Sequence, residues 1–218
     1  SQRAVVRPGD VDWVSSPAAG VERQMLDRVG DEVARATSIV RYAPGSAFPE
    51  HVHGGGEEFF VLEGVFSDET GDFPAGSYVR NPIGTKHAPF TRDGATIFVK
   101  LHQFLEDDTE QKAIDTTSAQ FTPGVVSGLS VLPLHETNAE RVALVRWEPG
   151  TRFNSHRHWG GEEILVLEGV FEDEHGRYPK GSWLRSPHLS EHTPFSEEGA
   201  LIYVKTGHLL PERSQRVA

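Results

Sequence analysis

The sequence predicts an all-β protein made of two tandem copies of one small module. Three observations support this fold class: an internal duplication, short apolar runs between regularly spaced turn residues, and very few helical patterns. The 218 residues suffice for one large domain or for two compact domains of about 100 residues each. The duplication decides for two domains.

Two segments of the chain repeat each other. Residues 45–100 align without a gap on residues 150–205, at a constant offset of 105 positions. Of the 56 aligned positions, 30 carry the same amino acid. A match of this length at one fixed spacing indicates an internal duplication. We therefore expect a first domain over residues 1–110 and a second domain over residues 111–218.

Each copy has the pattern of short strands separated by tight turns. Apolar runs such as residues 59–62 and 164–167 are bounded by clusters of glycine, proline and aspartate. Turn residues that recur about every 8 to 12 positions are typical of an all-β sandwich or barrel. A weak helical pattern occurs only in residues 106–115, next to the expected domain boundary.

The composition excludes several classes of protein. Hydrophobic residues make up 37% of the chain and charged residues 24%, as in ordinary globular domains. No stretch approaches the roughly 18 apolar residues of a membrane span, and the N-terminus lacks the apolar core of a secretory signal. We therefore expect a cytoplasmic protein with no membrane partner.

Charge and cysteine content narrow the choice further. With 21 Lys and Arg against 32 Asp and Glu the net charge is −11, so nucleic acid is not an expected partner. The chain has no cysteine, which excludes disulfides, thiolate ligands and a cysteine nucleophile. Any bound metal must be held by nitrogen and oxygen.

Both copies carry the same three histidines and one glutamate. The first two histidines are separated by one residue, which on a strand places both imidazoles on one face. The glutamate comes four residues after the second histidine. The third histidine comes 34 residues after the second histidine. The sets are His51, His53, Glu57 and His87 in the first copy, and His156, His158, Glu162 and His192 in the second. Three imidazoles and a carboxylate suit a divalent first-row metal ion.

Two alternatives remain open for these residues. Glu58 and Glu163 directly follow the two glutamates and occur at equal distance from the histidines, so either carboxylate of each pair is a candidate ligand. An isolated pair of histidines with this spacing is also often structural. The second copy argues against that explanation, although a duplication preserves residues without function as well.

The motifs of the first copy resemble those of the cupins. The run Gly45, five residues, His51-x-His53, three residues, Glu57, six residues and Gly64 is similar to the first cupin motif. The run Gly76, five residues, Pro82-x-Gly84, two residues and His87 is similar to the second. The repeated GEExxVLEGVFxDExGxxPxGS pattern most resembles the ChrR-like cupins, named for the cupin-like domain of an anti-sigma factor.

This resemblance implies two double-stranded β-helix jelly rolls in tandem, each with a metal inside the barrel. It places the ligands at the three histidines and the glutamate of each copy. The spacing of ChrR-like cupins favours Glu57 and Glu162, whereas the spacing of many other cupins selects Glu58 and Glu163. The implied cofactor is a divalent metal, with zinc or iron(II) as first choices and manganese or nickel as alternatives.

The same resemblance implies two main hypotheses for function. One is a metal-binding tandem cupin for sensing or ligand binding, as in the anti-sigma factor. The other is a non-haem dioxygenase that cleaves a carbon–carbon bond in a small diketone or aryl ketone, with substrate and O₂ at the metal. A structural or storage role for the metals is a third. Whether the protein is an enzyme stays open.

Expected partners follow from the same comparison. A small molecule or O₂ is expected at the metal, and a homodimer is expected because cupin sheets often associate through their outer faces. Contact with a sigma factor is not expected. Such anti-sigma factors bind the sigma factor through a separate N-terminal domain that holds zinc with histidine and cysteine ligands. This chain has no cysteine and begins its first cupin almost at once.

The two copies differ around their histidines. Trp159 stands where the first copy has Gly54, and Leu189 where it has Gly84. The turn that presents His192 is therefore expected to differ, and the first copy, closer to the general motif, is the safer candidate for metal binding. The remaining histidines have no partner at matching spacing and are not expected ligands; they include His102, His135, His175, His188 and His208.

Overall fold

The computed structural model describes residues 2–30 and 33–210. Within these residues the chain forms strands and turns, with no helix, and every strand pair is antiparallel. The prediction of an all-β fold is confirmed. No helix long and apolar enough to cross a membrane occurs in the described part of the chain.

The chain divides into two compact units. The first unit comprises residues 11–119, and the second unit comprises residues 1–10 and 120–216, as far as these are described. Each unit contains one copy of the repeat. The domain boundary near residue 110, which we expect from the repeats in the sequence, stays a prediction.

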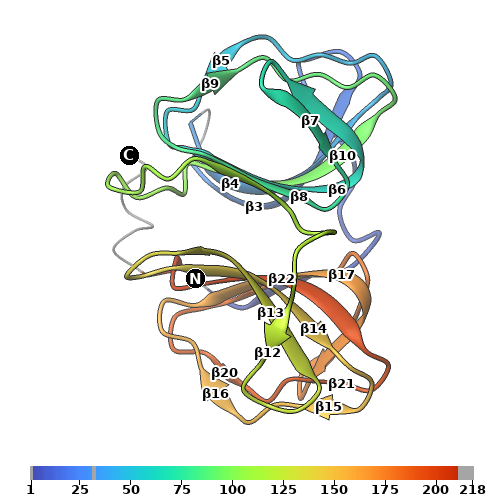
Figure 1. The fold of residues 1–218 in the computed structure, drawn as a ribbon, viewed down its shortest axis with the longest axis vertical. Helices are drawn as coiled ribbons and strands as arrows, with labels where there is room; N and C mark the ends of the chain where they lie inside the picture. The colour runs from blue at the N-terminus through green and yellow to red at the C-terminus, as the bar shows by residue number, and fades with distance from the viewer. Residues whose placement is uncertain (1, 31–32, 211–218) are drawn as a thin grey trace. The chain divides into compact units, whose positions relative to one another are not determined.

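The first unit is a curled sheet closed by short strands (Figure 1). Its strands are β2 (Val14–Ser15), β3 (Val21–Val29), β4 (Arg35–Tyr42), β5 (His51–Val52), β6 (Glu57–Asp68), β7 (Gly71–Pro74), β8 (Ser77–Asn81), β9 (Lys86–His87), β10 (Ala95–Leu101) and β11 (Lys112–Asp115). The large sheet has the order β11-β8-β6-β10-β4-β3-β2, with β7 paired to β6, and β5 pairs with β9 in a small sheet.

The second unit repeats this arrangement. Its strands are β1 (Ala4–Val6), β12 (Thr122–Pro123), β13 (Leu129–Glu136), β14 (Arg141–Trp147), β15 (Thr151–Arg152), β16 (His156–Arg157), β17 (Glu162–Asp173), β18 (Gly176–Pro179), β19 (Trp183–Ser186), β20 (Glu191–His192), β21 (Phe195–Ser196) and β22 (Ala200–Thr206). The large sheet has the order β1-β19-β17-β22-β14-β13-β12, and β16 pairs with β20.

Equivalent residues of the two copies build the two cores. In the first unit, alternate residues of β6 and β10 face inward and pack together, among them Phe59, Val61 and Ile97. The matching core of the second unit contains Ile164 and Val166 of β17, which pack against Ile202 of β22. Because side chains alternate across a strand, the neighbouring residues face the other side of each sheet.

The strands β6 and β17 are long and irregular at one point. Opposite β10 the pairing shifts so that Leu62 is an extra residue, and Leu167 is the extra residue opposite β22. A bulge of this kind bends a strand and increases its twist. Beyond it, β6 leaves β10 and pairs with β7, as β17 does with β18. Each long strand therefore runs through two faces of its barrel.

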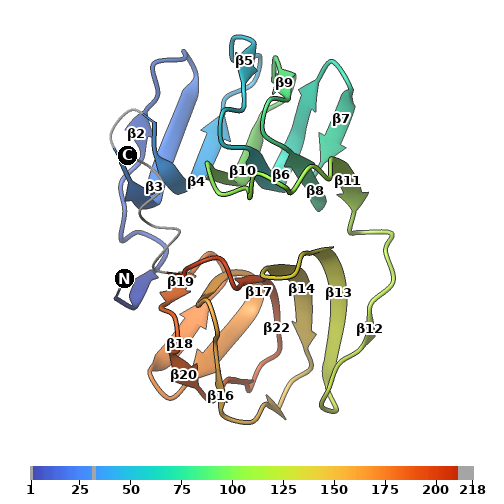
Figure 2. The ribbon, with the colours of Figure 1, turned by 90° about the vertical axis from the view of Figure 1, so that its left-hand side faces the viewer.

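An edge strand in each unit comes from an unexpected place in the sequence. The strand β1 precedes the first repeat but pairs with β19 of the second unit, as Figure 2 shows. The strand β11 pairs with β8. The prediction of a weak helix in residues 106–115 was therefore wrong. Pairing with the exposed hydrogen-bonding groups of β8 outweighs a weak local preference for helix.

The turn before the third histidine has the same backbone in both units. The amide of Gly84 donates to the carbonyl of His53 at 2.9 Å, and the amide of Leu189 to that of His158 at 2.8 Å. The expectation that the turn before His192 differs is therefore wrong for the backbone. This backbone requires Leu189 to adopt φ of 63°, in the left-handed region that favours glycine, which is energetically unfavourable for leucine.

The edge strand β1 is expected to stabilise the second unit. Val5 packs against the second core, so Val5→Asp would place an unpaired charge there and lower the free energy of unfolding by about 1–3 kcal/mol. Val14→Asp, at a valine that is 44% exposed in the first unit, is the matched control. Urea unfolding followed by tryptophan fluorescence measures both variants. Equal destabilisation by the two variants would contradict the role given to β1.

Leu189→Gly is expected to stabilise the second unit by about 0.5–1 kcal/mol, because it removes the cost of a left-handed leucine and loses little buried surface. Leu189 is 48% exposed. The reciprocal Gly84→Leu should destabilise the first unit by a similar amount, since an added Cβ meets no atom within 4 Å and only the backbone conformation opposes it. Unchanged unfolding midpoints in both variants would show that this strain is negligible.

Candidate metal centres

Short paired strands bring the histidines of each unit together. His51 of β5 lies directly opposite His87 of β9, and His156 of β16 lies opposite His192 of β20. His53 and His158 follow two residues after His51 and His156, on the same side. The glutamates begin the long strands β6 and β17. In each unit, one ligand atom from each of the four residues lies within 4.8 Å of the others.

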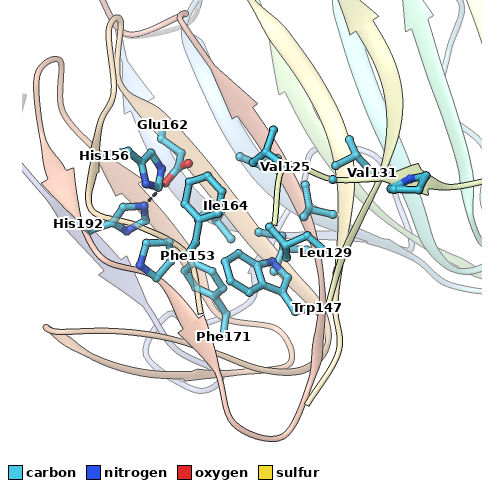
Figure 3. Close-up of a pocket in the computed structure, with 16 residues that line it drawn as sticks. Val125, Leu129, Val131, Trp147, Phe153, His156, Glu162, Ile164, Phe171 and His192 are labelled. Carbon is cyan, nitrogen blue, oxygen red and sulfur yellow. Dashed lines mark ion pairs between the residues drawn. The ribbon is translucent and has the colours of Figure 1, made fainter. Parts of the chain in front are cut away.

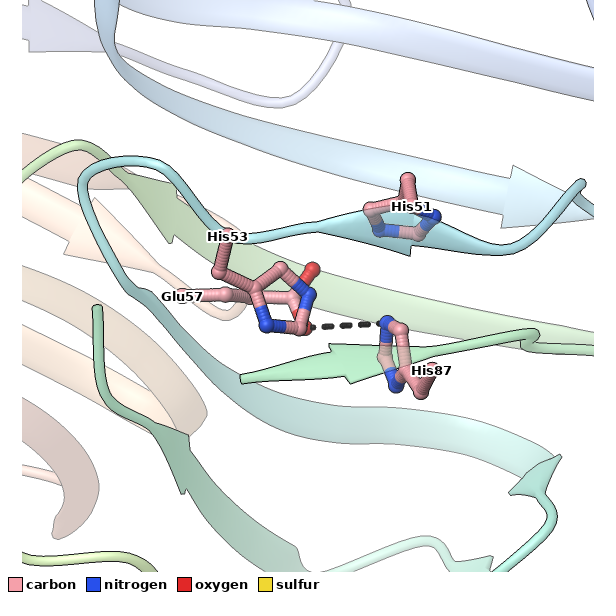
Figure 4. A group of neighbouring side chains, drawn as sticks. All are labelled: His51, His53, Glu57 and His87. Carbon is pink, nitrogen blue, oxygen red and sulfur yellow. Dashed lines mark ion pairs between the residues drawn. The ribbon is translucent and has the colours of Figure 1, made fainter. Parts of the chain in front are cut away.

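The first cluster is compact, as Figure 4 shows. Glu57 Oε2 lies 3.3 Å from the Nε2 atoms of both His53 and His87. The ring of His51 stands edge-on to that of His87, with 4.9 Å between the ring centroids. All these residues are buried except His51, which is half-buried. Four donor groups thus surround one point at the mouth of the barrel.

Hydrogen bonds orient the three imidazoles of the first cluster. The Nδ1 atoms lie 3.0 Å from the carbonyl of Pro49 for His51, 2.9 Å from the hydroxyl of Thr85 for His53, and 3.1 Å from Asp68 for His87. Since the Thr85 hydroxyl donates to the carbonyl of Pro82, it accepts from His53. These partners assign the proton to Nδ1, which leaves the Nε2 lone pairs directed at the cluster.

Unpaired buried atoms lie at the centre of both clusters. The Nε2 atoms of His53 and His87 have no hydrogen-bond partner among the described residues, and neither do those of His158 and His192 nor Oε1 of Glu162. Leaving such atoms buried and unpaired costs about 1–3 kcal/mol each, which a bound cation would offset. Nitrogen and oxygen atoms in this arrangement fit a divalent metal ion.

The second cluster is looser than the first. His192 Nε2 lies 3.6 Å from Glu162 Oε1, and the closest contact of His158 with Glu162 is 3.5 Å, through Nδ1. Ser190, at the position of Thr85, has a buried hydroxyl with no partner in the described part of the chain. His158 therefore lacks the hydroxyl contact that orients His53.

The aspartate behind His192 is held from the N-terminal segment. Asp173 lies 3.5 Å from Nδ1 of His192 and 2.8 Å from the guanidinium of Arg3, and it accepts a hydrogen bond from Tyr178. Although burial raises its pKa, the hydrogen bonds from His192 and Tyr178 lower it, so the carboxylate is kept ionised. The segment that carries β1 thus also supports the second cluster.

Burial favours the neutral form of His53, His156 and His158, which is the form that binds metal. Desolvation lowers the pKa of His53, against the opposing effect of Glu57, and lowers that of His158 to about 3. Desolvation also raises the pKa of Glu162 to about 7. Burial alone would lower the pKa of His192, but its hydrogen bond to Asp173 and the charge of Glu162 raise it.

The alternative glutamates have other partners. Glu58 accepts from Arg80 at 2.7 Å, and Arg80 also pairs with Asp108. Glu163 accepts from the indole of Trp183 at 3.0 Å and contacts His208. Strand alternation explains the difference, because adjacent residues of β6 and β17 point to opposite faces of the sheet. The structure thus brings Glu57 and Glu162, and not Glu58 and Glu163, beside the histidines.

A cavity adjoins each cluster. The first has a volume of about 230 Å³, and its wall includes His51, His53 and Glu57. The second has a volume of about 410 Å³, and Figure 3 shows His156, Glu162 and His192 at one end of it. The rest of its wall is apolar, with Trp147, Phe153, Ile164 and Phe171 among the side chains. Both clusters are therefore open to a small molecule from the barrel interior.

Sequence reasoning missed several residues at these sites. Asp68 and Asp173 are identical in the two copies, which was a usable signal, but their pattern also fits a turn. Arg23 and His102 line the first cavity and have no repeated counterpart that marks them. Trp159, which stands where the first copy has Gly54, does not line the second cavity; it is 70% exposed and its ring stands edge-on to His188.

Solved structures with related folds cover nearly the whole chain. A candidate dioxygenase of Nostoc punctiforme has a TM-score of 0.79 at 16% identity, over 96% of this chain and 84% of its own. YlbA of Escherichia coli has a TM-score of 0.72 at 15% identity, over 94% and 90%. Oxalate decarboxylase OxdC of Bacillus subtilis has a TM-score of 0.68 at 15% identity, over 96% and 78%. At these identities the likeness concerns the fold.

Sequence comparison identifies the family. The anti-sigma-E factor ChrR of Cereibacter sphaeroides is 38% identical over 71 residues, which are 32% of this chain and 32% of ChrR. The chain thus matches about a third of the length of this relative. The family model of the ChrR cupin-like domain matches residues 1–105 and again residues 109–210. The chain therefore belongs to the ChrR cupin-like domain family, as a tandem cupin with two copies of that domain.

Proposed function

We propose that each unit binds one divalent transition-metal ion through three histidines and one glutamate, and that a small molecule reaches this ion from the adjoining cavity. The ligands would be His51, His53, Glu57 and His87 in the first unit, and His156, His158, Glu162 and His192 in the second. Support comes from the buried, unpaired Nε2 atoms that converge in each cluster. Iron(II) and zinc are the first candidates, with manganese and nickel as alternatives; Mn(II) centres are described for the B. subtilis oxalate decarboxylase.

We further propose that the second unit is a dioxygenase site for a small, mainly apolar diketone or aryl ketone. The observation that carries this proposal is the cavity of about 410 Å³ whose wall contains both the cluster and a large apolar surface. A metal that only braces a barrel needs no such space, because structural sites are closed by their ligands. When bound, the metal would supply Lewis acidity and a place for O₂ activation.

The residues of the chain would perform the remaining tasks. Asp173 and the carbonyl of Asn154 orient the imidazoles of His192 and His156 through their Nδ1 atoms. Ile164, Phe171 and Ile202 form an apolar wall that excludes water and favours the hydrocarbon part of a substrate. The buried carboxylate of Glu162 would offset part of the charge of the ion.

Binding of a small molecule without turnover is the second candidate function. It is favoured by the similarity to part of ChrR, whose name describes an anti-sigma factor. Both functions use the same metal and the same cavity, and they differ in whether O₂ is consumed. A homodimer and the lack of contact with a sigma factor stay predictions.

The ligand assignment predicts how metal content divides between the two units. The double variant His51→Ala with His53→Ala should lose about half of the bound metal, and His156→Ala with His158→Ala the other half. His175→Ala, at an exposed histidine outside both clusters, is the control. Elemental analysis of each purified variant, with circular dichroism to confirm folding, gives the result. Full metal content in either double variant would refute the assignment.

Oxygen uptake tests the proposed reaction. With iron(II) supplied, the protein should consume O₂ in the presence of a small diketone or aryl ketone. The variant with His156→Ala and His158→Ala should lose this uptake, while the variant with His51→Ala and His53→Ala keeps it. A Clark electrode with a panel of such ketones measures the rates. Zinc in the purified protein and no uptake after iron loading would contradict the dioxygenase and leave the metal sites in place.

A further inference from the structure

The two cavities differ at matched positions of their walls. In the first unit Arg23 of β3 pairs with Val40 of β4, and in the second unit Val131 of β13 pairs with Val145 of β14. Because Val40 and Val145 are equivalent in the repeat offset, Arg23 occupies the position of Val131. Both residues line their cavities. A permanently charged side chain of the first wall thus stands where the second has a valine.

A second position of the wall is also more polar in the first cavity than in the second. Tyr42 and Trp147 are equivalent in the two copies, and each lines its cavity. The first cavity therefore has a guanidinium and a phenol on the strands where the second has only apolar atoms and an indole. The lining of the first cavity also includes apolar side chains, among them Val21, Phe48, Ile97 and Val99, beside Ser16, His102 and three residues of the metal cluster.

Arg23 has no anionic partner in the part of the chain that the structure describes. Its Nε atom is buried and makes no hydrogen bond. The adjacent Glu22 points to the other side of the strand, where it pairs with Arg41 at 2.7 Å and both side chains are exposed. Partial burial of a cation without a counter-charge is costly, and a carboxylate ligand would remove that cost.

His102 is a second unusual feature of this cavity. It has φ of 56°, in the left-handed region, whereas the second copy has Gly207 at the equivalent position with φ of 86°. Its imidazole lies against Gly55, where an added Cβ would come within 2.2 Å of Nδ1. Non-glycine residues held in this conformation are often found at ligand sites. The first unit therefore keeps a strained histidine on the cavity wall where the second has glycine.

We propose that the first cavity binds a small organic carboxylate with an apolar body, whose anionic group pairs with Arg23, whereas the second cavity takes neutral molecules. The volume of about 230 Å³ is below the range of roughly 300–1,000 Å³ that is usual for drug-sized ligands, so the ligand is small. The inference deepens the proposed function, since the same cavity adjoins the first metal cluster. Arg23 acts in it as a residue that determines specificity.

Calorimetric titration with benzoate and benzamide tests the proposal, because the two probes have nearly the same shape and differ in charge. The 218-residue chain, loaded with metal, should bind benzoate at least tenfold more tightly than benzamide. Arg23→Val, which installs the residue of the second copy, should reduce benzoate affinity at least tenfold and leave benzamide affinity and metal content unchanged. Arg41→Val, at an exposed arginine on the adjacent strand, is the control and should change neither affinity.

The outcomes separate this inference from the proposed function. Equal binding of the two probes, no binding of benzoate at millimolar concentration, or an unchanged benzoate affinity in Arg23→Val would overturn the inference while the metal content stays as proposed. Failure of the protein without substitutions to bind metal would contradict the proposed function. Benzoate binding that still depends on Arg23 would in that case support only the inference about the first cavity. Arg23→Gln provides a second variant of similar size if Arg23→Val fails to fold, as judged by its unfolding midpoint.

Discussion

The bend of one long strand in each unit is the constraint on which the rest of the site depends. The strand β6 begins with Glu57 and ends with Asp68, and eleven extended residues would separate their Cα atoms by about 36 Å. Both carboxylates nevertheless contact the same imidazole: Glu57 lies 3.3 Å from Nε2 of His87, and Asp68 lies 3.1 Å from Nδ1. The strand must therefore curve around the barrel. The bulge at Leu62 and the change of partner from β10 to β7 allow that curve.

Much of the fold and of the candidate site could be predicted from the sequence because of the internal repeat. The donors lie within the repeated segments, where a second copy at fixed spacing separates them from histidines of no special role. His51 and His87 lie on two short paired strands that β6, β7 and β8 separate along the chain, and the proline and glycine of the turn that precedes His87 are visible in the sequence. The choice of Glu57 over Glu58 needed the observed face of β6, since alternation along a strand says only that the two residues point to opposite sides.

The features that sequence could not provide depend on contacts between distant segments. The strand β11 was taken for a weak helix because its partner β8 lies more than 30 residues earlier, and β1 pairs with a strand nearly 180 residues later. Arg23 was missed for a related reason. It lies outside the aligned repeats, and only the pairing of β3 with β4 shows that it shares a cavity with His51 and His53.

The candidate metal ligands and the wall residues that make the two cavities differ thus come from different parts of each copy. All eight candidate metal ligands lie in the segments 45–100 and 150–205, and their spacing is the same in both units. These two segments carry the same amino acid at 30 of 56 positions. Arg23, Tyr42, Val131 and Trp147 come from strands that precede these segments. A substitution there changes the charge and volume of a cavity without moving a donor, because β3 and β13 contribute no donor to the clusters. Duplication of this module therefore allows two candidate metal sites of one design to adjoin cavities of different charge and volume, and the looser second cluster with its larger apolar cavity is the form that such divergence takes in this chain.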